Sequence, residues 1–369
     1  MPVSRDRWMR AGVLTGRIIA AIVSASLIVA FGYGWKNYRD LNRGLHRFNL
    51  PSINLPRQNG GAAPTPAAPQ VKGRDENILI TGADDRSSMT PSEIKLLHVG
   101  HDASLSTDVI MIVHVPADGS TATLLSIPRD SYVDIPGFQK NKINAAYADG
   151  YRFTNGSPPA KQAAGADKLV QTVTDLTGLT ITHYVQVGFV GFYRIAQAIN
   201  GITVNLCKNV SDPAGSGFVQ SAGTHDLTPV ESLQFVRQRH FIPGGDLGRA
   251  KRARYFLTAA FRKIASAGML LNPARLRNLV RAITRSVYID EAFSVTDFAS
   301  QMANLSANNI AGRTIPTRGQ GSSNVGDVVF VDPAAVRRFA TQLVNGTLPV
   351  PKRQHHRPAR HPIDASCIN

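Results

Sequence analysis

Short apolar runs alternate with longer amphipathic segments along this chain. Residues 77–81 are an apolar run that ends at Gly82, a pattern typical of a buried strand. Residues 109–115 and 121–127 predict two further strands, joined by a turn at 116–119. The remaining predicted elements are strands at 184–187, 202–206 and 326–331, and helices at 163–176, 191–199, 248–267, 273–286, 294–306 and 333–344.

One more helix is predicted from its first turn. Thr228-Pro229-Val230-Glu231 has the spacing of a capping box, with proline at the first helical position. The helix that starts there is expected to reach Arg239. Because strands alternate with helices, the pattern predicts an α/β fold in which helices pack on a central mixed sheet.

The N-terminal region carries a different pattern. Residues 18–35 are 18 residues without a charge, just long enough to span a bilayer. Four arginines precede this segment, and Lys36, Arg39, Arg43 and Arg47 follow it, so the charge balance does not decide its orientation. A signal anchor with a short cytoplasmic arm is favoured, and a cleaved signal peptide is the main alternative.

These patterns divide the chain into five parts. They are a cytoplasmic arm at 1–17, a transmembrane anchor at 18–35, a linker rich in Pro, Gly and Ala at 36–74, a folded domain at 75–345 and a basic tail at 346–369. The tail is expected to be disordered. His355, His356 and His361 lie in it, and solvated charge is favoured over a metal site for them.

Composition restricts the partners. The formal net charge is +16 and the pI about 10.2, which favours anionic partners such as nucleic acids, anionic lipids or phosphate-bearing polymers. No basic stripe with interleaved aromatics and no zinc or helix-turn-helix module is present, so nucleic acid is not expected. The two cysteines, Cys207 and Cys367, fit no zinc or redox motif.

Arginines stand at the ends of several predicted elements. Arg129 follows Ser126-Ile127-Pro128, and Arg237, Arg239 and Arg249 surround the end of one helix and the start of the next. Guanidinium forks bind phosphate oxygens in bidentate fashion and keep their charge, so such a group is suited to a diphosphate. Asp130 is a candidate to orient Arg129 or another arginine, and an ordinary surface salt bridge is the alternative for Arg129. Arg252, one helical turn after Arg249, is expected to face the same pocket.

Acidic residues stand next to two strands. Asp84 follows the first strand and Asp108 opens the second, so they are candidates to hold magnesium together with substrate phosphates. Alternatively, Asp84 and Asp85 are ordinary turn residues. No serine–histidine–aspartate arrangement and no Gly-rich phosphate loop of the G-x-x-x-x-G-K type is present.

Taken together, four motifs resemble the LytR–CpsA–Psr family of cell-wall glycopolymer ligases, in their actinobacterial form. The motifs are Asn77–Arg86, Leu125–Asp130, Lys142–Tyr147, and Phe235–Arg239 with Gly245–Arg249, and the resemblance covers residues 75 to 345. The resemblance implies an α/β/α sandwich with an apolar lipid groove. It also implies an extracytoplasmic phosphotransferase that moves a glycan phosphate from a polyprenyl-diphosphate carrier to a peptidoglycan hydroxyl.

The same resemblance assigns roles to residues. Arg86, Arg129, Lys142, Arg237, Arg239 and Arg249 would bind the diphosphate, and Asp84 and Asp108 would hold magnesium or manganese. Asp84, Asp108 or Asp246 would take the acceptor proton. The second acidic motif lacks the family's usual arginine and reads Ser106-Thr107-Asp108, and Ala253 replaces a usual glutamine. A binder that has lost turnover, or a hydrolase of the same lipid, are therefore alternatives.

The actinobacterial resemblance suggests arabinogalactan as the glycan. If the domain is exported, Cys207 and Cys367 could form a disulfide.

Overall fold

The computed structural model describes residues 46–53, 73–84, 90–91, 94, 97, 104–238, 246–266, 287–294, 297–298, 301–302, 305–348 and 367–368. They belong to one compact unit, His46–Asn369. None of the helices within these ranges is long and apolar enough to cross a membrane. The predicted anchor at 18–35 lies outside the described residues, as do the helix predicted at 273–286 and the three tail histidines.

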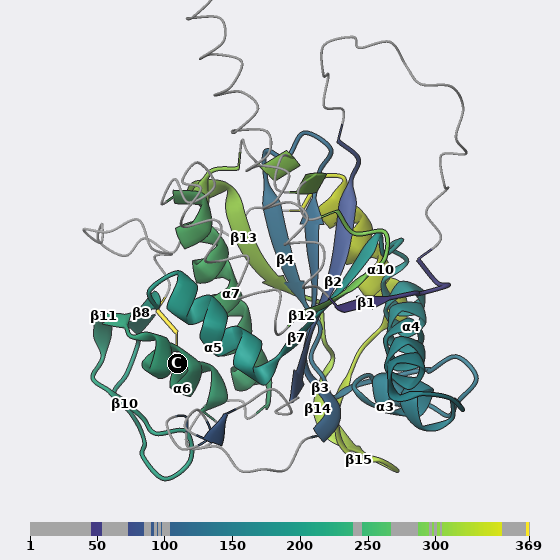
Figure 1. The fold of residues 1–369 in the computed structure, drawn as a ribbon, viewed down its shortest axis with the longest axis horizontal. Helices are drawn as coiled ribbons and strands as arrows, with labels where there is room; N and C mark the ends of the chain where they lie inside the picture. The colour runs from purple at the N-terminus through teal and green to yellow at the C-terminus, as the bar shows by residue number, and fades with distance from the viewer. Residues whose placement is uncertain are drawn as a thin grey trace, which may run out of the picture. The chain divides into compact units, whose positions relative to one another are not determined.

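A seven-stranded mixed sheet is the centre of this unit (Figure 1). Its order is β1 (His46–Phe48), β12 (Val287–Asp290), β7 (His183–Gly188), β2 (Glu76–Asp84), β3 (Ser104–Val115), β4 (Ala122–Ser126) and β13 (Ile310–Thr314). β2 is parallel to β7 and antiparallel to β3, and β4 is parallel to β13. The predicted central mixed sheet is therefore confirmed.

Helices cover both faces of the sheet (Figure 1). α3 (Ala145–Arg152), α4 (Pro158–Thr177) and α10 (Pro333–Val344) pack on one face, where Ile110, Ile112 and Leu125 are buried in their shared core. α5 (Phe189–Ala198) and α7 (Asp246–Ser266) lie on the opposite side, and α6 (Pro229–Arg237) packs against both. Side chains alternate between the faces of a strand, so the continuous apolar run of β3 supplies both cores.

Three smaller sheets complete the unit. One has four strands in the order β14 (Gly319–Ser323), β15 (Gly326–Phe330), β5 (Ser131–Val133) and β6 (Asn141–Lys142). Two antiparallel pairs are β8 (Ile202–Leu206) with β11 (Gly223–Leu227), and β9 (Val210–Asp212) with β10 (Phe218–Gln220). A single 3-10 turn, η3 (Ala307–Asn309), precedes β13.

The start of the folded unit differs from the sequence prediction. His46–Phe48 forms β1 and pairs in parallel with β12, although these residues fall within the predicted linker 36–74. Phe48 is 3% exposed and stacks on Tyr288 at 5.2 Å between ring centroids. A strand of three residues is too short to show a period-2 pattern in the sequence. Its partner strand, β12, lies more than two hundred residues further along the chain, so no local signal predicts the pairing.

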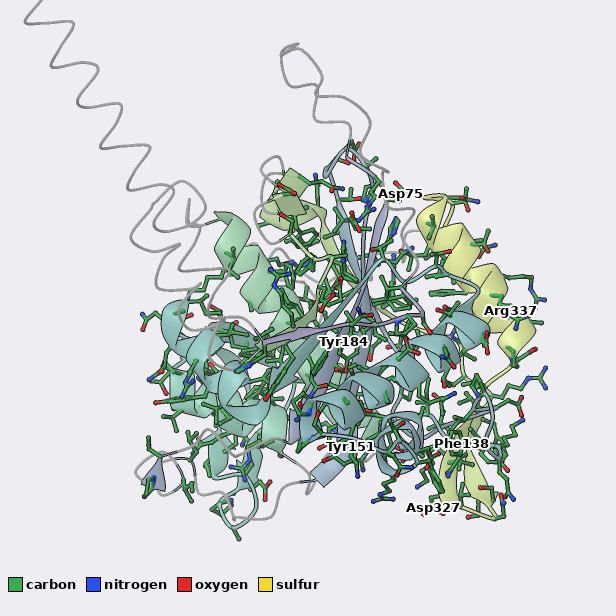
Figure 2. All side chains as sticks on the ribbon, turned by 45° about the vertical axis from the view of Figure 1, so that its right-hand side comes forward. Asp75, Phe138, Tyr151, Tyr184, Asp327 and Arg337 are labelled. Atoms are coloured by element: carbon green, nitrogen blue, oxygen red, sulfur yellow. A yellow bond between two sulfur atoms is a disulfide. The ribbon has the colours of Figure 1, made fainter. Side chains whose placement is uncertain are left out.

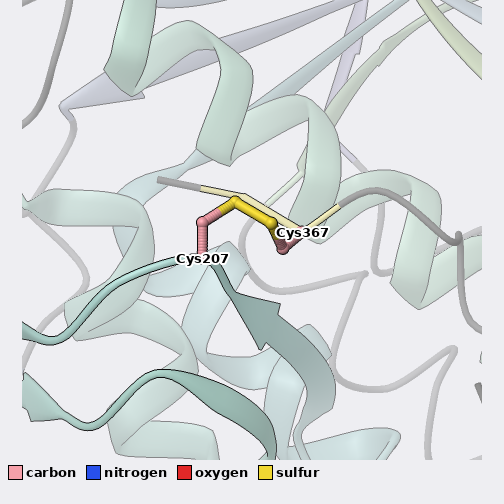
Figure 3. The surroundings of a disulfide bond; sticks show 2 residues. All are labelled: Cys207 and Cys367. Atoms are coloured by element: carbon pink, nitrogen blue, oxygen red, sulfur yellow. A yellow bond between two sulfur atoms is a disulfide. The ribbon is translucent and has the colours of Figure 1, made fainter. Parts of the chain in front are cut away.

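The C-terminal residues also differ from the prediction of a disordered tail. Cys207 and Cys367 form a disulfide with a Cα–Cα distance of 4.9 Å (Figure 3). Ile368, 2% exposed, pairs in parallel with Leu206, and its amide donates to the Asn205 carbonyl at 2.8 Å. Ile368 therefore extends the β8–β11 pair.

Candidate active site

The site begins with an irregularity in the pairing of β2 with β3. Gly82 pairs with Val109 and Ala83 with Thr107, so Asp108 has no partner on β2. A bulge of this kind redirects a side chain and ends regular pairing. At Gly82 the backbones are too close for a side chain, since a Cβ there would come within 2.9 Å of the Val109 Cβ. The Asp108 side chain remains 28% exposed.

Arg129 stands in the segment that leaves β4, and that segment is fixed by backbone hydrogen bonds. Ser131 N donates to the Pro128 carbonyl at 3.0 Å, and Asn144 N donates to the Arg129 carbonyl at 3.1 Å. Pro128 itself is buried. The backbone at Arg129 is therefore held by one hydrogen bond within its own turn and by another from the segment after β6.

Arg129 belongs to a chain of four side chains in which negative and positive charges alternate. Its Nη1 lies 2.6 Å from Asp108 Oδ1, and its Nε lies 3.5 Å from Asp130 Oδ2. Lys142 Nζ lies 3.3 Å from the other oxygen of Asp130. We call these four residues the charge cluster. Asp130 therefore contacts both Arg129 and Lys142, and partial burial makes these pairs stronger than ordinary surface salt bridges.

The β5–β6 hairpin brings Lys142 into this cluster. Tyr132 pairs with Lys142, so Asp130, just before β5, lies next to Lys142. The sequence pattern did not predict either strand, because two or three residues are too few to show alternation. The order of the motifs was the only signal that Lys142 belonged to the site.

Two positive and two negative groups balance within the charge cluster. A diphosphate would therefore need further positive charge, or would replace one carboxylate as the partner of Arg129. Arg129 and Lys142 are each about a quarter exposed, which leaves both accessible to a ligand.

Arg237 is the last residue of α6, the helix that was predicted from its capping box. Thr228 and Glu231 form that capping box, as expected. α6 ends at Arg237 rather than at Arg239, because Gln238 leaves the helix with ψ of 128°. Arg237 Nη1 donates to the Leu97 carbonyl at 2.7 Å, within the connection that follows Asp84. The Arg237 side chain, at the end of α6, therefore contacts the connection between β2 and β3.

A profile of the LytR_cpsA_psr family matches residues 55–345.

This chain belongs to the LytR_cpsA_psr family.

Its relatives are cell-wall proteins. The Cell wall biosynthesis protein LcpA of Corynebacterium glutamicum is 35% identical over 95% of this chain and 70% of its own length. The protein named Polyisoprenyl-teichoic acid--peptidoglycan teichoic acid transferase TagU, of Oceanobacillus iheyensis, is 29% identical over 64% of this chain and 67% of its own length. The actinobacterial form of the resemblance is confirmed by the Corynebacterium relatives LcpA and LcpB.

Solved structures of the family share the fold. B. subtilis TagV has a TM-score of 0.58 and 22% identity over 75% of this chain and 98% of TagV. TagT bound to LI-WTA has a TM-score of 0.55 and 20% identity over 81% of this chain and 98% of TagT. At these identities the likeness supports the mixed α/β architecture and nothing finer.

Some residues with roles in the LytR_cpsA_psr family are placed only by their backbone. Asp84 ends β2 opposite Ser104, while Asp246 opens α7 and Arg249 lies in its first turn. The positions of their side chains are not described. Arg86 and Arg239 lie outside the described residues.

Arg252 corrects one expectation about this group. It was expected to share a pocket with Arg249, but it is 1% exposed and its guanidinium lies 4.8 Å from the centre of the Phe235 ring. Burial lowers its pKa to about 10, and Asp212 opposes that shift. Arg252 therefore belongs to the packing between α6 and α7.

The two departures from the family pattern have different surroundings. Ala253 is fully buried in α7, so at this position the chain has a core residue in place of the family's glutamine. Ser106 lies in β3 within a second irregularity of the β2–β3 pairing. The Ser106 side chain is not described.

The donor set near Asp108 fits magnesium that shares its ligands with a substrate. Asp84 ends β2 and Asp108 bulges from the adjacent strand, so two carboxylate-bearing positions meet at one end of the sheet. Magnesium is commonly held by one or two carboxylates plus phosphate oxygens. Within the described ranges no three His, Cys, Asp or Glu residues gather to form an all-protein metal site.

Proposed function

We propose that this protein is a phosphotransferase that moves a glycan phosphate from a polyprenyl-diphosphate carrier to a peptidoglycan hydroxyl. The observation that carries the proposal is the Asp108–Arg129–Asp130–Lys142 charge cluster at the end of β2, β3 and β4 in a LytR_cpsA_psr domain. The name of TagU supports transfer of a wall polymer to peptidoglycan, and the name of LcpA supports a role in cell-wall biosynthesis. Arabinogalactan is the first glycan to test.

The reaction requires the residues to position and neutralise phosphates. The acceptor oxygen attacks the phosphorus next to the glycan, and the bond from that phosphorus to the bridging oxygen breaks. Polyprenyl phosphate leaves with the electron pair, and the acceptor proton passes to a carboxylate of Asp84, Asp108 or Asp246. In such transfers, fixed charge and orientation supply most of the rate.

Each member of the charge cluster has a distinct task in this proposal. Arg129 would bind diphosphate oxygens with its planar fork, held in direction by Asp108 and Asp130. Lys142 would add a point charge beside it. Arg86, Arg237, Arg239 and Arg249 would supply the positive charge that the balanced cluster lacks. Magnesium, held by Asp84 and Asp108, would neutralise charge on the phosphate oxygens.

We further propose that the folded domain lies outside the cytoplasm, with residues 1–17 inside and 18–35 as the anchor. The Cys207–Cys367 disulfide supports this location, because structural disulfides persist in oxidising compartments. The lipid tail of the substrate would remain in or near the same membrane. An apolar groove for it is part of the proposal.

The test uses the full chain with a polyprenyl-diphosphate oligosaccharide, peptidoglycan fragments and magnesium. Products are followed by mass spectrometry. Glycan joined to peptidoglycan through phosphate is the expected product. Free phosphoglycan would instead indicate a hydrolase, and unchanged bound lipid would indicate a binder.

Arg129→Ala should reduce transfer by about 10²–10³-fold, the usual loss when one transition-state donor is removed. Arg129→Lys should recover only part of that loss, because an ammonium cannot form the bidentate contact. The matched control is Arg337→Ala on α10, where the guanidinium caps the Asp175 carbonyl instead (Figure 2). Transfer by Arg129→Ala at the rate of the control would contradict the assigned site.

A further inference from the structure

A row of side chains leads away from the charge cluster across the four-stranded sheet. Lys142 on β6 pairs with Tyr132 on β5, and Tyr132 pairs with Phe330 on β15. Residues paired in register lie on the same face of a sheet. The row Lys142–Tyr132–Phe330 is therefore continuous, and its first member is the lysine bound to Asp130.

The aromatic part of the row is held in place by its neighbours. The Tyr132 and Phe330 rings meet edge to face, with centroids 6.2 Å apart and planes at 88°. The Tyr132 hydroxyl donates to Asn324 Oδ1 at 2.8 Å, and Lys140 Nζ lies 5.0 Å from the centre of the Tyr132 ring. These contacts fix the tyrosine ring, and the Lys140 ammonium lies over it, so Phe330 supplies the exposed ring of the row.

Phe330 stays at the surface although it is a large apolar residue. It is 37% exposed, one of the few large hydrophobic side chains so exposed in the described residues. Its ring lies against the backbone of Gly321, where an added Cβ would come within 2.8 Å of the ring. Glycine at 321 therefore leaves room for the edge of the Phe330 ring beside β14, and part of the ring remains exposed.

The chemistry of this row matches a sugar better than an apolar partner. Sugar rings present polarised C–H groups, which stack on the negative face of an aromatic ring, and hydroxyls, which bond to polar neighbours. Tyr132 and Phe330 supply the rings, and Lys140 and Asn324 supply polar groups beside them. With strands about 4.8 Å apart, the row is about 10 Å long, roughly the length of two sugar rings.

We propose that the Lys142–Tyr132–Phe330 row binds the acceptor glycan strand and brings one of its hydroxyls to the charge cluster. The row is open at the sheet edge, because β14 is the last strand, so a long polymer can continue beyond it. Its inner end meets the cluster at Asp130 and Lys142, beside the arginine assigned to phosphate. This inference rests on the proposed phosphotransfer and names its acceptor subsite.

The test measures binding and transfer separately, with the full chain in detergent. The probes are soluble peptidoglycan glycan strands and, separately, a polyprenyl-diphosphate disaccharide. Phe330→Ala should weaken strand binding about tenfold, a common loss when an aromatic anchor is truncated, and leave lipid binding unchanged. It should also raise the KM for the acceptor more than it lowers kcat.

Two further variants keep the test specific. Phe330→Leu retains an apolar side chain over Gly321 but has no aromatic face, so it should also lose strand binding while it folds normally by circular dichroism. The matched control is Phe153→Ala, because Phe153 is 74% exposed but packs in a tilted arrangement against Phe138, and neither residue belongs to the row or to the charge cluster. The control should bind strands as the unchanged protein does.

The outcomes separate this inference from the proposed function. Unaltered strand binding by both Phe330 variants would overturn the inference, even if transfer proceeds. Loss of lipid binding in place of strand binding would show that the row serves the donor, and would overturn it as well. If the unchanged protein transfers nothing but the Phe330 variants still lose strand binding, the subsite stands and the phosphotransfer fails.

Discussion

Charged residues of the same type have quite different surroundings in this molecule. Arg129 lies between two carboxylates and keeps a quarter of its side chain exposed, which suits exchange of partners with a ligand. Arg252 is buried over Phe235 and has a lowered pKa, which suits packing. Both stand in or next to a motif, so burial is what separates the residue proposed to bind phosphate from the one that packs in the core.

His114 is a second buried titratable residue. It is 5% exposed, and its Nδ1 lies 2.9 Å from Asn77 Oδ1. The Asn77 amide nitrogen donates to the Thr180 carbonyl, so Asn77 Oδ1 is an acceptor and Nδ1 carries the proton. Burial lowers the pKa of His114, and Asp75 opposes that effect.

Because the pKa of His114 is lower in the folded state, the unfolded chain binds more protons below pH 6.5, the ordinary value. Stability is therefore expected to fall as pH decreases through and below 6.5. His114→Gln should reduce this fall, as measured by urea unfolding followed from about pH 7.5 to about pH 5. His225→Gln on β11 is the control, and an equal pH slope in all three proteins would contradict the assignment.

At the scale of elements, the shortest pieces determine where the functional groups lie. β5 and β6 are two or three residues long, yet their pairing joins Lys142 to Asp130. Their stability comes from the neighbours: β15 pairs with β5, and the Asp130 carbonyl accepts the Val329 amide at 2.8 Å. Intrinsic strand propensity contributes little at such lengths.

The segment Cys367–Ile368 is a second short piece, and it is expected to affect the stability of the fold. The disulfide joins cysteines 160 residues apart, so it restricts a long stretch of the unfolded chain. Replacing both cysteines by serine should lower the free energy of unfolding by about 2–4 kcal/mol, measured by urea denaturation and far-UV circular dichroism.

The unchanged protein treated with reductant should behave like this double variant. Identical urea midpoints with and without the disulfide would show that the link adds nothing beyond the docking of Ile368.

At the scale of the whole molecule, compartment is the main question. Positive charges flank residues 18–35 on both sides, so they do not choose an orientation. A disulfide within the folded unit favours an oxidising side for that unit. The net charge of +16 is also suited to a wall and membrane surface rich in phosphate.

The proposed topology predicts the protease sensitivity of the chain in intact spheroplasts. Added protease should remove a tag placed after Asn369 and should leave a tag before Met1 intact, as judged by immunoblot. A cytoplasmic protein in the same cells serves as the control and should survive. Protection of the C-terminal tag with loss of the N-terminal one would reverse the proposed topology.

The sequence by itself determined the elements with strong local signals. The apolar runs of β2, β3 and β4, the capping box of α6 and the helix over 333–344 were all predicted from neighbouring residues. The order of four motifs determined the family, and with it the choice of Arg129 and Asp108. Each of these signals can be read from neighbouring residues or from the order of segments along the chain, so these predictions did not require knowledge of how the segments pack.

Only the tertiary structure decided which of those residues meet. The pairing of Arg129 with Asp108 depends on a bulge in β3, and the pairing of Asp130 with Lys142 depends on a hairpin of very short strands. The burial of Arg252, the Cys207–Cys367 disulfide and the strand at 46–48 depend on still more distant segments. Such contacts form because the whole core brings their segments together, and the loop-closure entropy that opposes them leaves no local pattern in the sequence.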